Sequence, residues 1–455
     1  MHKKIDLTEG KIANKLVLLS LPIIGTSFIQ MGYNLTDMLW LGNYSTKAVA
    51  AVGTAGFFTW FGNALALIAK TGAEVGVAQS IGKKNEADIK SYIHNAVKMT
   101  LILGLVYGII LFIFRSSIID FFKIADTEVV RMAEIFLAIS AVGIIPLFIN
   151  PVFTGIFNAS GDSKTPFVAN TIGLITNITL DPILIYGVGP IKSLGVIGAG
   201  IATVSAQFLV TILFLYALSK RSESYFKINV RGKFNKPILK NIFKIGLPVA
   251  MQNGLFSCFS MIIGRIISPW GYGAIAAQKV GSQIEAISWL STGGLATALG
   301  AFVGQNYGAR KGKRIYKGYF ITIALAVAIG IFATLLLIFG GEAIFSLFSK
   351  EPQTVAIGKS YLRILGFSQL FMCIEITTAG VFNGLGKTIY PSVMSIILTG
   401  LRIPLALFLA YRTSLALDGV WWSISISSIF KGIVIIVMLY FFIYKKNVVS
   451  KEEAV

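Results

Sequence analysis

The chain has 455 residues, of which 55% are hydrophobic and only 13% are charged, about half the charged share of an ordinary soluble protein. This balance is typical of a polytopic membrane protein, and no stretch is long and polar enough to form a separate soluble domain. Lys and Arg outnumber Asp and Glu by 40 to 20. Because the basic residues gather in short loops between apolar segments, we expect membrane lipids and no nucleic acid as partners.

Apolar segments of about 20 residues or more, each able to cross a roughly 30 Å hydrocarbon layer as a helix, recur along the whole chain. We expect twelve membrane-spanning helices, at residues 16–41, 48–80, 93–114, 130–152, 164–188, 194–218, 240–266, 274–304, 317–340, 357–383, 390–411 and 419–443. The predicted fold class is therefore an all-α polytopic membrane protein.

The loops between these segments carry an uneven charge. The loops near residues 83–90, 219–240 and 310–317, together with both termini, hold about two dozen basic residues. The opposite loops hold about half a dozen, at Lys47, Arg115, Lys123, Lys192, Lys350 and Arg412. The positive-inside rule then places both termini in the cytoplasm and the chain in the plasma (cytoplasmic) membrane.

The two halves of the chain look like copies of each other. Leu21-Pro22 recurs as Leu247-Pro248, an offset of 226, and the turn at Gly155–Gly161 recurs at Gly380–Gly386, an offset of 225. Six spans in each half make these parallel repeats, and the natural place for a substrate is the cleft between them. We expect two pseudo-symmetric six-helix lobes in a monomer, with the boundaries 1–218, 219–240 (a basic cytoplasmic linker) and 241–455.

Two carboxylates lie inside the apolar segments of the first half. Asp37 lies near the end of the first span and Asp181 in the fifth, where a charge costs roughly 2.5–3.5 kcal/mol. Their counterparts in the second half are Ile263 and Ala406. Packing alone therefore does not explain why the first half carries acids at these two positions. The alternative is that each Asp caps a helix end or pairs with a lysine.

Oxygen-bearing side chains accompany both acids at helical spacing. Tyr33 and Asn34 lie four and three residues before Asp37, and Asn177 lies four residues before Asp181. Carboxylate, amide and hydroxyl oxygens suit Na⁺ at Asp37, Asp181 and Asn177. The two carboxylates, Asp37 and Asp181, suit a proton equally well, because desolvation and like charge raise a carboxyl pKa. We predict an ion-coupling site, with Na⁺ and H⁺ both open.

Other charges within the spans are harder to interpret. Lys70 and Glu74 stand at positions i and i+4 and can simply neutralise each other. Glu375 lies deep in the tenth span, with Arg402 as a candidate partner, and marks a candidate second acidic site. Cys258 and Cys373 both fall in apolar segments, and neither a disulfide framework, a metal site nor a cofactor is expected.

The chain resembles the MATE (multidrug and toxic compound extrusion) family at several short motifs. These are the early Leu21-Pro22, Asp37 followed by Gly42, the Gly82-Lys83-Lys84 loop, the two Phe-Asn-x-x-Gly turns at 157–161 and 382–386, and Asn177 with Asp181-Pro182. The resemblance covers nearly the whole chain, and the order and spacing of these motifs make the match specific. It implies a twelve-helix ion-coupled transporter.

The paired acids are most similar to the DinF-like branch of that family. In that branch the resemblance implies a cation site formed by Asp37, Asp181, Asn177 and Tyr33. A small residue and a Thr four later on the sixth helix also contribute there, which fits Ala199 and Thr203. The NorM-like branch carries an acid in the seventh helix that is missing here around Cys258, whereas Glu375 is similar to its tenth-helix acid.

We therefore expect a cation-coupled antiporter, not an enzyme, that exports amphipathic or cationic organic compounds by alternating access. Candidate residues of the substrate cleft are Asn34, Asn150, Asn158, Gln252, Asn253, Gln278, Gln283 and Glu375. For each amide, hydrogen bonding between helices is the equally plausible role. The alternatives are a lipid-linked saccharide flippase of the same wider superfamily, which needs a strongly cationic cleft, and a membrane-embedded enzyme, whose catalytic constellation we do not find.

Overall fold

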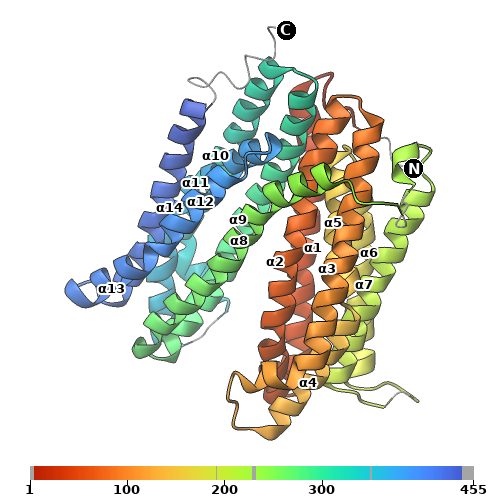
Figure 1. Ribbon diagram of the computed structural model, residues 1–455. Coiled ribbons are helices and arrows are strands. Elements are labelled where there is room, and N and C mark those ends of the chain that lie inside the picture. The colour runs from red at the N-terminus through yellow and green to blue at the C-terminus, as the bar shows by residue number, and fades with distance from the viewer. Residues whose placement is uncertain (1–4, 191, 228–231, 349–350, 443–455) are drawn as a thin grey trace. The chain divides into compact units, whose positions relative to one another are not determined.

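The computed structural model describes residues 5–190, 192–227, 232–348 and 351–442, and the regular elements in them are all helices (Figure 1). The first half contains α1 (Ile12–Tyr44), α2 (Thr46–Gly82), α3 (Glu86–Asp120), α4 (Thr127–Val142), α5 (Ile144–Ala159), α6 (Lys164–Ile185), α7 (Val196–Ser219) and the short η1 (Ser224–Phe226). The second contains α8 (Lys236–Ile267), η2 (Ser268–Trp270), α9 (Tyr272–Gly308), α10 (Gly312–Ser346), α11 (Pro352–Gly384), α12 (Ile389–Gly400), α13 (Arg402–Arg412) and α14 (Leu417–Tyr440). The predicted all-α fold is confirmed.

The number of membrane crossings also agrees with the prediction. Within the described ranges, eleven helical segments are long and apolar enough to cross a membrane, and α4 with α5 makes a twelfth if the bent pair is one span. These two helices meet at an angle of 50°. Gly143 separates them, and Pro146 has no N–H to donate to the carbonyl of Val142, so the helix cannot continue unbroken.

The chain divides by its contacts into two compact units. Unit 1 contains residues 1–5 and 25–250, and unit 2 contains residues 6–24 and 251–455. Helix α1 thus passes from unit 2 to unit 1 after Ile24, and α8 passes from unit 1 to unit 2 after Ala250. Both passages lie two residues beyond a proline, Pro22 in α1 and Pro248 in α8. The predicted lobes were defined by the sequence repeat, whereas the two units are defined by contacts between residues, so their boundaries differ.

Polar side chains explain why the start of the chain belongs to unit 2. Leu7 is fully buried, and its carbonyl accepts hydrogen bonds from Asn306 Nδ2 at 3.1 Å and Arg314 Nη2 at 3.3 Å. Lys311 Nζ donates to the carbonyl of Thr8 at 3.0 Å. Because these bonds bind backbone carbonyls, they hold the segment in place whatever its side chains are.

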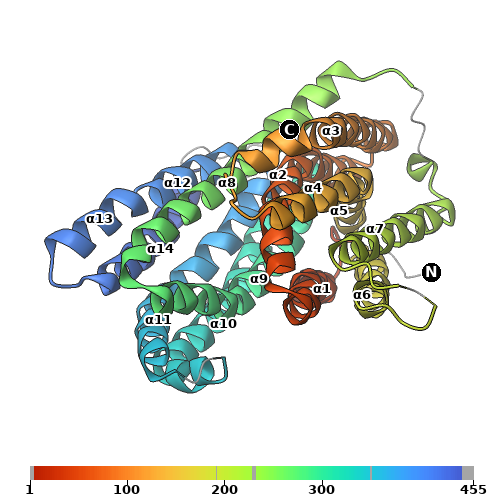
Figure 2. The same ribbon diagram turned by 90° about the horizontal axis from the view of Figure 1, so that it is seen from below.

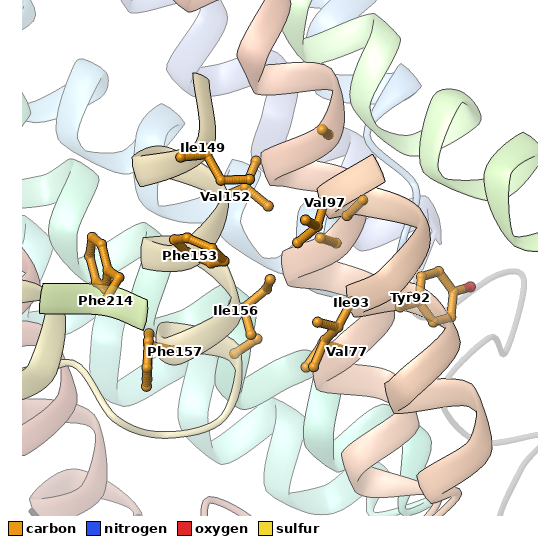
Figure 3. Packing of buried hydrophobic residues seen from close by; sticks show 14 of the residues in the cluster. Val77, Tyr92, Ile93, Val97, Ile149, Val152, Phe153, Ile156, Phe157 and Phe214 are labelled. Atoms are coloured by element: carbon orange, nitrogen blue, oxygen red, sulfur yellow. The ribbon is translucent and has the colours of Figure 1, made fainter. Parts of the chain in front are cut away.

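The core of unit 1 lies among α2, α3, α5 and α7 (Figure 3). Phe157 of α5 stacks on Phe214 of α7 with ring centroids 5.8 Å apart. Glycines let the backbones approach: a Cβ on Gly76 would lie 2.2 Å from the ring of Tyr92. Lipid offers the helices no hydrophobic driving force for association, so close packing of this kind holds them together.

We predict that Gly246→Ala lowers the stability of the protein more than Gly254→Ala does. The new Cβ at Gly246 would lie 2.0 Å from the carbonyl oxygen of Ile68, whereas nothing lies within 4 Å of a Cβ at Gly254. Overpacking against backbone costs about 1–3 kcal/mol or more. Thermal unfolding of the purified variants measures the difference, and equal midpoints would show that α2 and α8 do not meet at this point.

Candidate functional site

Asp37 and Asp181, which are 144 positions apart in the sequence, meet inside unit 1. Asp37 belongs to α1 and Asp181 to α6, and the Asp37 carboxyl interacts directly with the side chains of Asp181 and Asn177. Asn177 and Asp181 are completely buried. The half-buried Asp37 and the fully buried Asp181 therefore lie together in a membrane-spanning bundle.

A third helix completes the cluster. Thr203 on α7 places its hydroxyl 3.3 Å from Asp37 Oδ2 and 3.0 Å from the carbonyl oxygen of Ala199, within donor range of both. Asn177 Nδ2 donates to Asp181 Oδ1 at 3.3 Å. The structure thus brings together Asp37, Asp181, Asn177 and Thr203 as hydrogen-bonding neighbours.

Four oxygens of this cluster lack hydrogen-bond partners within the described part of the chain. They are Tyr33 Oη, Asp37 Oδ1, Asn177 Oδ1 and Asp181 Oδ2, and all four are shielded from solvent. Buried polar atoms are almost always paired, so such a set calls for an additional group. Three of the four atoms are acceptors only, which fits a cation or a proton bound among them.

Small residues on α6 and α7 make room for this arrangement. A Cβ on Gly173 would lie 2.5 Å from Tyr33 Oη, so only glycine leaves space for the tyrosine hydroxyl beside α6. A Cβ on Gly198 would lie 2.4 Å from the carbonyl oxygen of Leu184, which brings α7 against α6 next to Asp181. The two helices lie side by side in both views (Figures 1 and 2).

An aromatic contact fixes the ends of α1 and α6 close to the acids. The hydroxyl of Tyr186 donates to the carbonyl of Trp40 at 2.7 Å. Its ring packs edge-on against Trp40 and also lies near Tyr44, with centroids 6.1 Å apart in both cases. Trp40 lies three residues after Asp37, so this contact sets the register of α1 against α6.

The predicted amides have different surroundings. Asn150 is held between helices, because its Nδ2 donates to Gln207 and its Oδ1 accepts from Thr211 at 2.8 Å. Asn158 is buried, and its Oδ1 has no partner among the described residues. The others lie on α8 and α9 of unit 2, where Gln252, Asn253 and Gln278 are half-buried and Gln283 is exposed. The side chain of Asn34 lies outside the described part of the structure.

Glu375 forms an ion pair with a residue that the sequence did not suggest as its partner. Its Oε2 forms an ion pair with Lys431 Nζ of α14 at 2.9 Å, and both side chains are buried. Arg402 instead donates to Ser427 Oγ at 2.5 Å and Ser428 Oγ at 3.0 Å. The direct ion pair of Glu375 is thus with Lys431, on a helix whose packing the sequence did not predict. The charge of Glu375 also acts on Arg402, the partner suggested from the sequence.

Comparison with known proteins identifies the family. The MatE family model matches residues 22–183 and again residues 248–408, together more than half of the chain. The chain belongs to the MATE family. The two matches begin at Pro22 and Pro248, which are equivalent positions of the sequence repeat. The family model therefore matches each half of this MATE protein separately.

Two of its relatives match more than nine tenths of the chain. The chain is 27% identical over 454 residues to the "Probable multidrug resistance protein NorM" of Thermotoga maritima, which covers 98% of this chain and 96% of that protein. It is 25% identical to the "FAD transporter" of Shewanella oneidensis, with 92% of each covered.

Solved structures agree with the family. A crystal structure of MATE in complex with MaD3S matches with a TM-score of 0.90 at 25% identity over all of both chains. A MOP superfamily transporter from Pyrococcus furiosus, described as having a binding pocket of reverse polarity, matches with a TM-score of 0.88 at 25% identity. The match covers 99% of this chain and 100% of that one. This MATE protein is an integral membrane transporter and not an enzyme, while its place in the DinF-like branch stays a prediction.

We predict that Glu375→Leu destabilises unit 2 far more than the double substitution Glu375→Leu with Lys431→Leu. The single change leaves Lys431 buried without its counterion, which costs about 3–5 kcal/mol, whereas replacing both partners by apolar residues is close to neutral. A double-mutant cycle on the free energy of unfolding measures this. Additive losses would mean that the pair has no coupling energy.

Proposed function

We propose that this MATE protein is an antiporter that uses a gradient of H⁺ or Na⁺ to export organic compounds. The observation that supports this most directly is the set of four unpartnered oxygens around Asp37 and Asp181. Two carboxylates that each carry a shielded oxygen without a partner are costly in hydrocarbon, and a bound cation or proton removes that cost. Because binding of the ion stabilises this site, an ion gradient can change how often the site is occupied and so drive the transporter.

The mechanism follows from differential affinity. Ion binding at Asp37 and Asp181 neutralises charge and lets Asn177, Tyr33 and Thr203 close around it, which favours one conformation of the transporter. The exported compound favours the other. Neither ligand has to touch the other, because each shifts the equilibrium by its difference in affinity for the two states.

The proposed substrates are amphipathic or cationic organic molecules. The support comes from relatives named as multidrug resistance proteins in Thermotoga maritima and Bacillus subtilis. The clefts of such exporters need apolar contacts with few polar groups, which suits a chain with 33 Phe, 16 Tyr and 10 Met residues.

We further propose the plasma membrane as its location, with both termini in the cytoplasm and the protein acting as a monomer. The support is the charge of the loops: the α2–α3 turn carries Lys83 and Lys84, and the α9–α10 turn carries Arg310 and Lys311. The partners proposed are the transported compounds and the surrounding lipid. No cofactor is invoked beyond the coupling ion.

We expect Asp37→Asn and Asp181→Asn each to reduce gradient-driven efflux at least about tenfold, which corresponds to about 1.4 kcal/mol of lost ion binding. Efflux of a fluorescent cationic dye from proteoliposomes, with Na⁺ and H⁺ gradients imposed separately, measures this and identifies the ion. Asp126→Asn is the matched control, because Asp126 is an exposed N-cap where Asn serves equally well. Full coupled transport by both site variants would refute the proposal.

We also expect Gly173→Ala to weaken ion coupling, with some loss of stability because the added Cβ would also lie 2.4 Å from Val210 Cγ2 in the core. The added Cβ would lie 2.5 Å from Tyr33 Oη and displaces the hydroxyl from the cluster. Tyr33→Phe removes the same oxygen without a clash and should change the ion dependence of dye efflux in the same direction. Gly53→Ala, where nothing lies within 4 Å, is the control. An unchanged ion dependence in both site variants would exclude Tyr33 from the ion site.

A further inference from the structure

The start of α8 carries three lysines along one side of the helix. Lys236, Lys240 and Lys244 follow one another at intervals of four residues, and all three are exposed. None of them forms an ion pair among the described residues. Residues 220–244 contain eight Lys and Arg against a single Glu. Because like charges at this spacing repel each other, the lysine stripe needs an external anion to balance it.

The repeat shows that a helix at this place in the fold does not require such a stripe. At the offset of 226, the counterparts of the three lysines are Gly10, Asn14 and Leu18, none of which is charged. The corresponding helix α1 has two lysines near its own start, Lys11 and Lys15, but no third one a turn further along. Packing of the fold therefore does not explain the stripe.

The opposite side of the same helical turns is fixed against the bundle of unit 1. A Cβ on Gly72 of α2 would lie 2.6 Å from the carbonyl oxygen of Ile242, which is fully buried. Asn241 Nδ2 donates to the hydroxyl of Tyr92 of α3 at 2.6 Å. Because α2 and α3 cover this side of α8, the lysine stripe is held facing away from them.

The segment that leads into α8 is fixed as well. The ammonium of Lys98, a buried residue of α3, donates to the carbonyls of Gly232 and Lys233, each at 2.9 Å. The backbone N–H of Asn235 donates to Asn95 Oδ1 at 3.0 Å. The lysine stripe thus begins on an anchored backbone, so a ligand does not have to order the helix before it binds.

The charge pattern of α8 places the lysine stripe at the edge of the membrane. Residues 245–264 are uncharged, and Arg265 follows them. As a helix these 20 residues extend about 30 Å, the thickness of the hydrocarbon layer. Lys244 then lies where the hydrocarbon ends. Lys240 and Lys236 lie about 6 and 12 Å further along the axis, within the headgroup layer and at its outer edge.

Apolar side chains lie on the same side of the helix as the lysines. Phe243 and Leu247, three and seven residues after Lys240, are 38% and 43% exposed. A phospholipid matches this order of groups, because its phosphate lies above its glycerol and acyl chains. A soluble anion would contact the ammonium groups alone and would leave the phenyl ring and the leucine uncovered. The surface therefore favours a lipid over a free phosphate.

We propose that the lysine stripe of α8 binds the headgroups of anionic phospholipids in the surrounding leaflet. The ammonium groups of Lys236, Lys240 and Lys244 lie beside the phosphates, while Phe243 and Leu247 contact the glycerol and the upper part of the acyl chains. Clusters of basic residues next to a membrane-spanning helix attract anionic lipids in this way. The proposal requires only that α8 crosses the membrane, so it does not depend on the coupling ion or on the exported compound.

Native mass spectrometry of the purified full-length protein, titrated with phosphatidylglycerol or phosphatidylcholine, tests the site. We expect the wild type to bind phosphatidylglycerol more tightly than phosphatidylcholine. The triple variant Lys236→Gln, Lys240→Gln, Lys244→Gln should bind phosphatidylglycerol at least about tenfold more weakly, with binding of phosphatidylcholine unchanged. Equal binding of phosphatidylglycerol by wild type and variant would overturn the proposal.

A matched control separates the lysine stripe from the overall positive charge of the protein. Lys83→Gln, Lys90→Gln and Lys313→Gln together remove the same three charges from exposed positions outside the stripe. This variant should bind phosphatidylglycerol as the wild type does. If it loses as much affinity as the stripe variant, net charge attracts the lipid and the site is refuted.

Two further measurements test the chemistry of the site. Replacing the three lysines of the stripe by arginine keeps the charges, so the affinity for phosphatidylglycerol should be retained; a loss as large as that of the glutamine variant would show that charge is not what binds. Soluble glycerol phosphate, added at the concentration of the lipid, should not displace phosphatidylglycerol. Displacement would overturn the assignment to a lipid and would indicate a site for soluble anions.

Discussion

Every polar group that this chain places in hydrocarbon must find a partner, and this requirement shapes the structure at two levels. At the level of the backbone, it makes the described part of the chain helical, with the spans interrupted between α4 and α5 at Gly143 and between α12 and α13 at Leu401. At the level of side chains, it makes the few exceptions informative. The oxygens left without partners at Asp37 and Asp181 among the described residues are the basis of the ion site that we propose.

The duplication shows how one helical framework supports two different interiors. Asp37 and Asp181 meet in unit 1, and their counterparts Ile263 and Ala406 belong to a single buried apolar cluster in unit 2. The two positions are therefore occupied by carboxyl groups in unit 1 and by buried apolar side chains in unit 2. Because the apolar version packs well, the contact does not need acids for stability. That is the physical reason to assign the acids of unit 1 a role in ion binding.

Much of this was predictable from sequence, because hydropathy and helical spacing act locally. The spans, and the neighbours of Asp37 and Asp181 on their own helices, follow from residues a few turns apart, and the repeat follows from motifs that recur about 225 positions later. What the sequence did not predict depends on which helix faces which. The pairing of Glu375 with Lys431 joins residues from α11 and α14, and the space that Gly173 leaves for Tyr33 joins α6 and α1. The sequence indicates that these residues are unusual but not which helices they contact.

The charges of the two units also differ in how they are balanced. In unit 2, Glu375 has Lys431 as a direct counterion, and Arg402 is held by serine hydroxyls. A buried acid that already has a lysine gains little from a further cation, which would have to displace or share that partner. In unit 1, no lysine or arginine forms an ion pair with Asp37, Asp181 or Glu74 among the described residues. Glu285 of unit 2 also forms no ion pair among the described residues, and its shielded Oε1 has no hydrogen-bond partner there, so the contrast holds for Glu375 alone. We therefore expect an external cation or proton to change the energy of the Asp37–Asp181 cluster more than that of the Glu375–Lys431 pair.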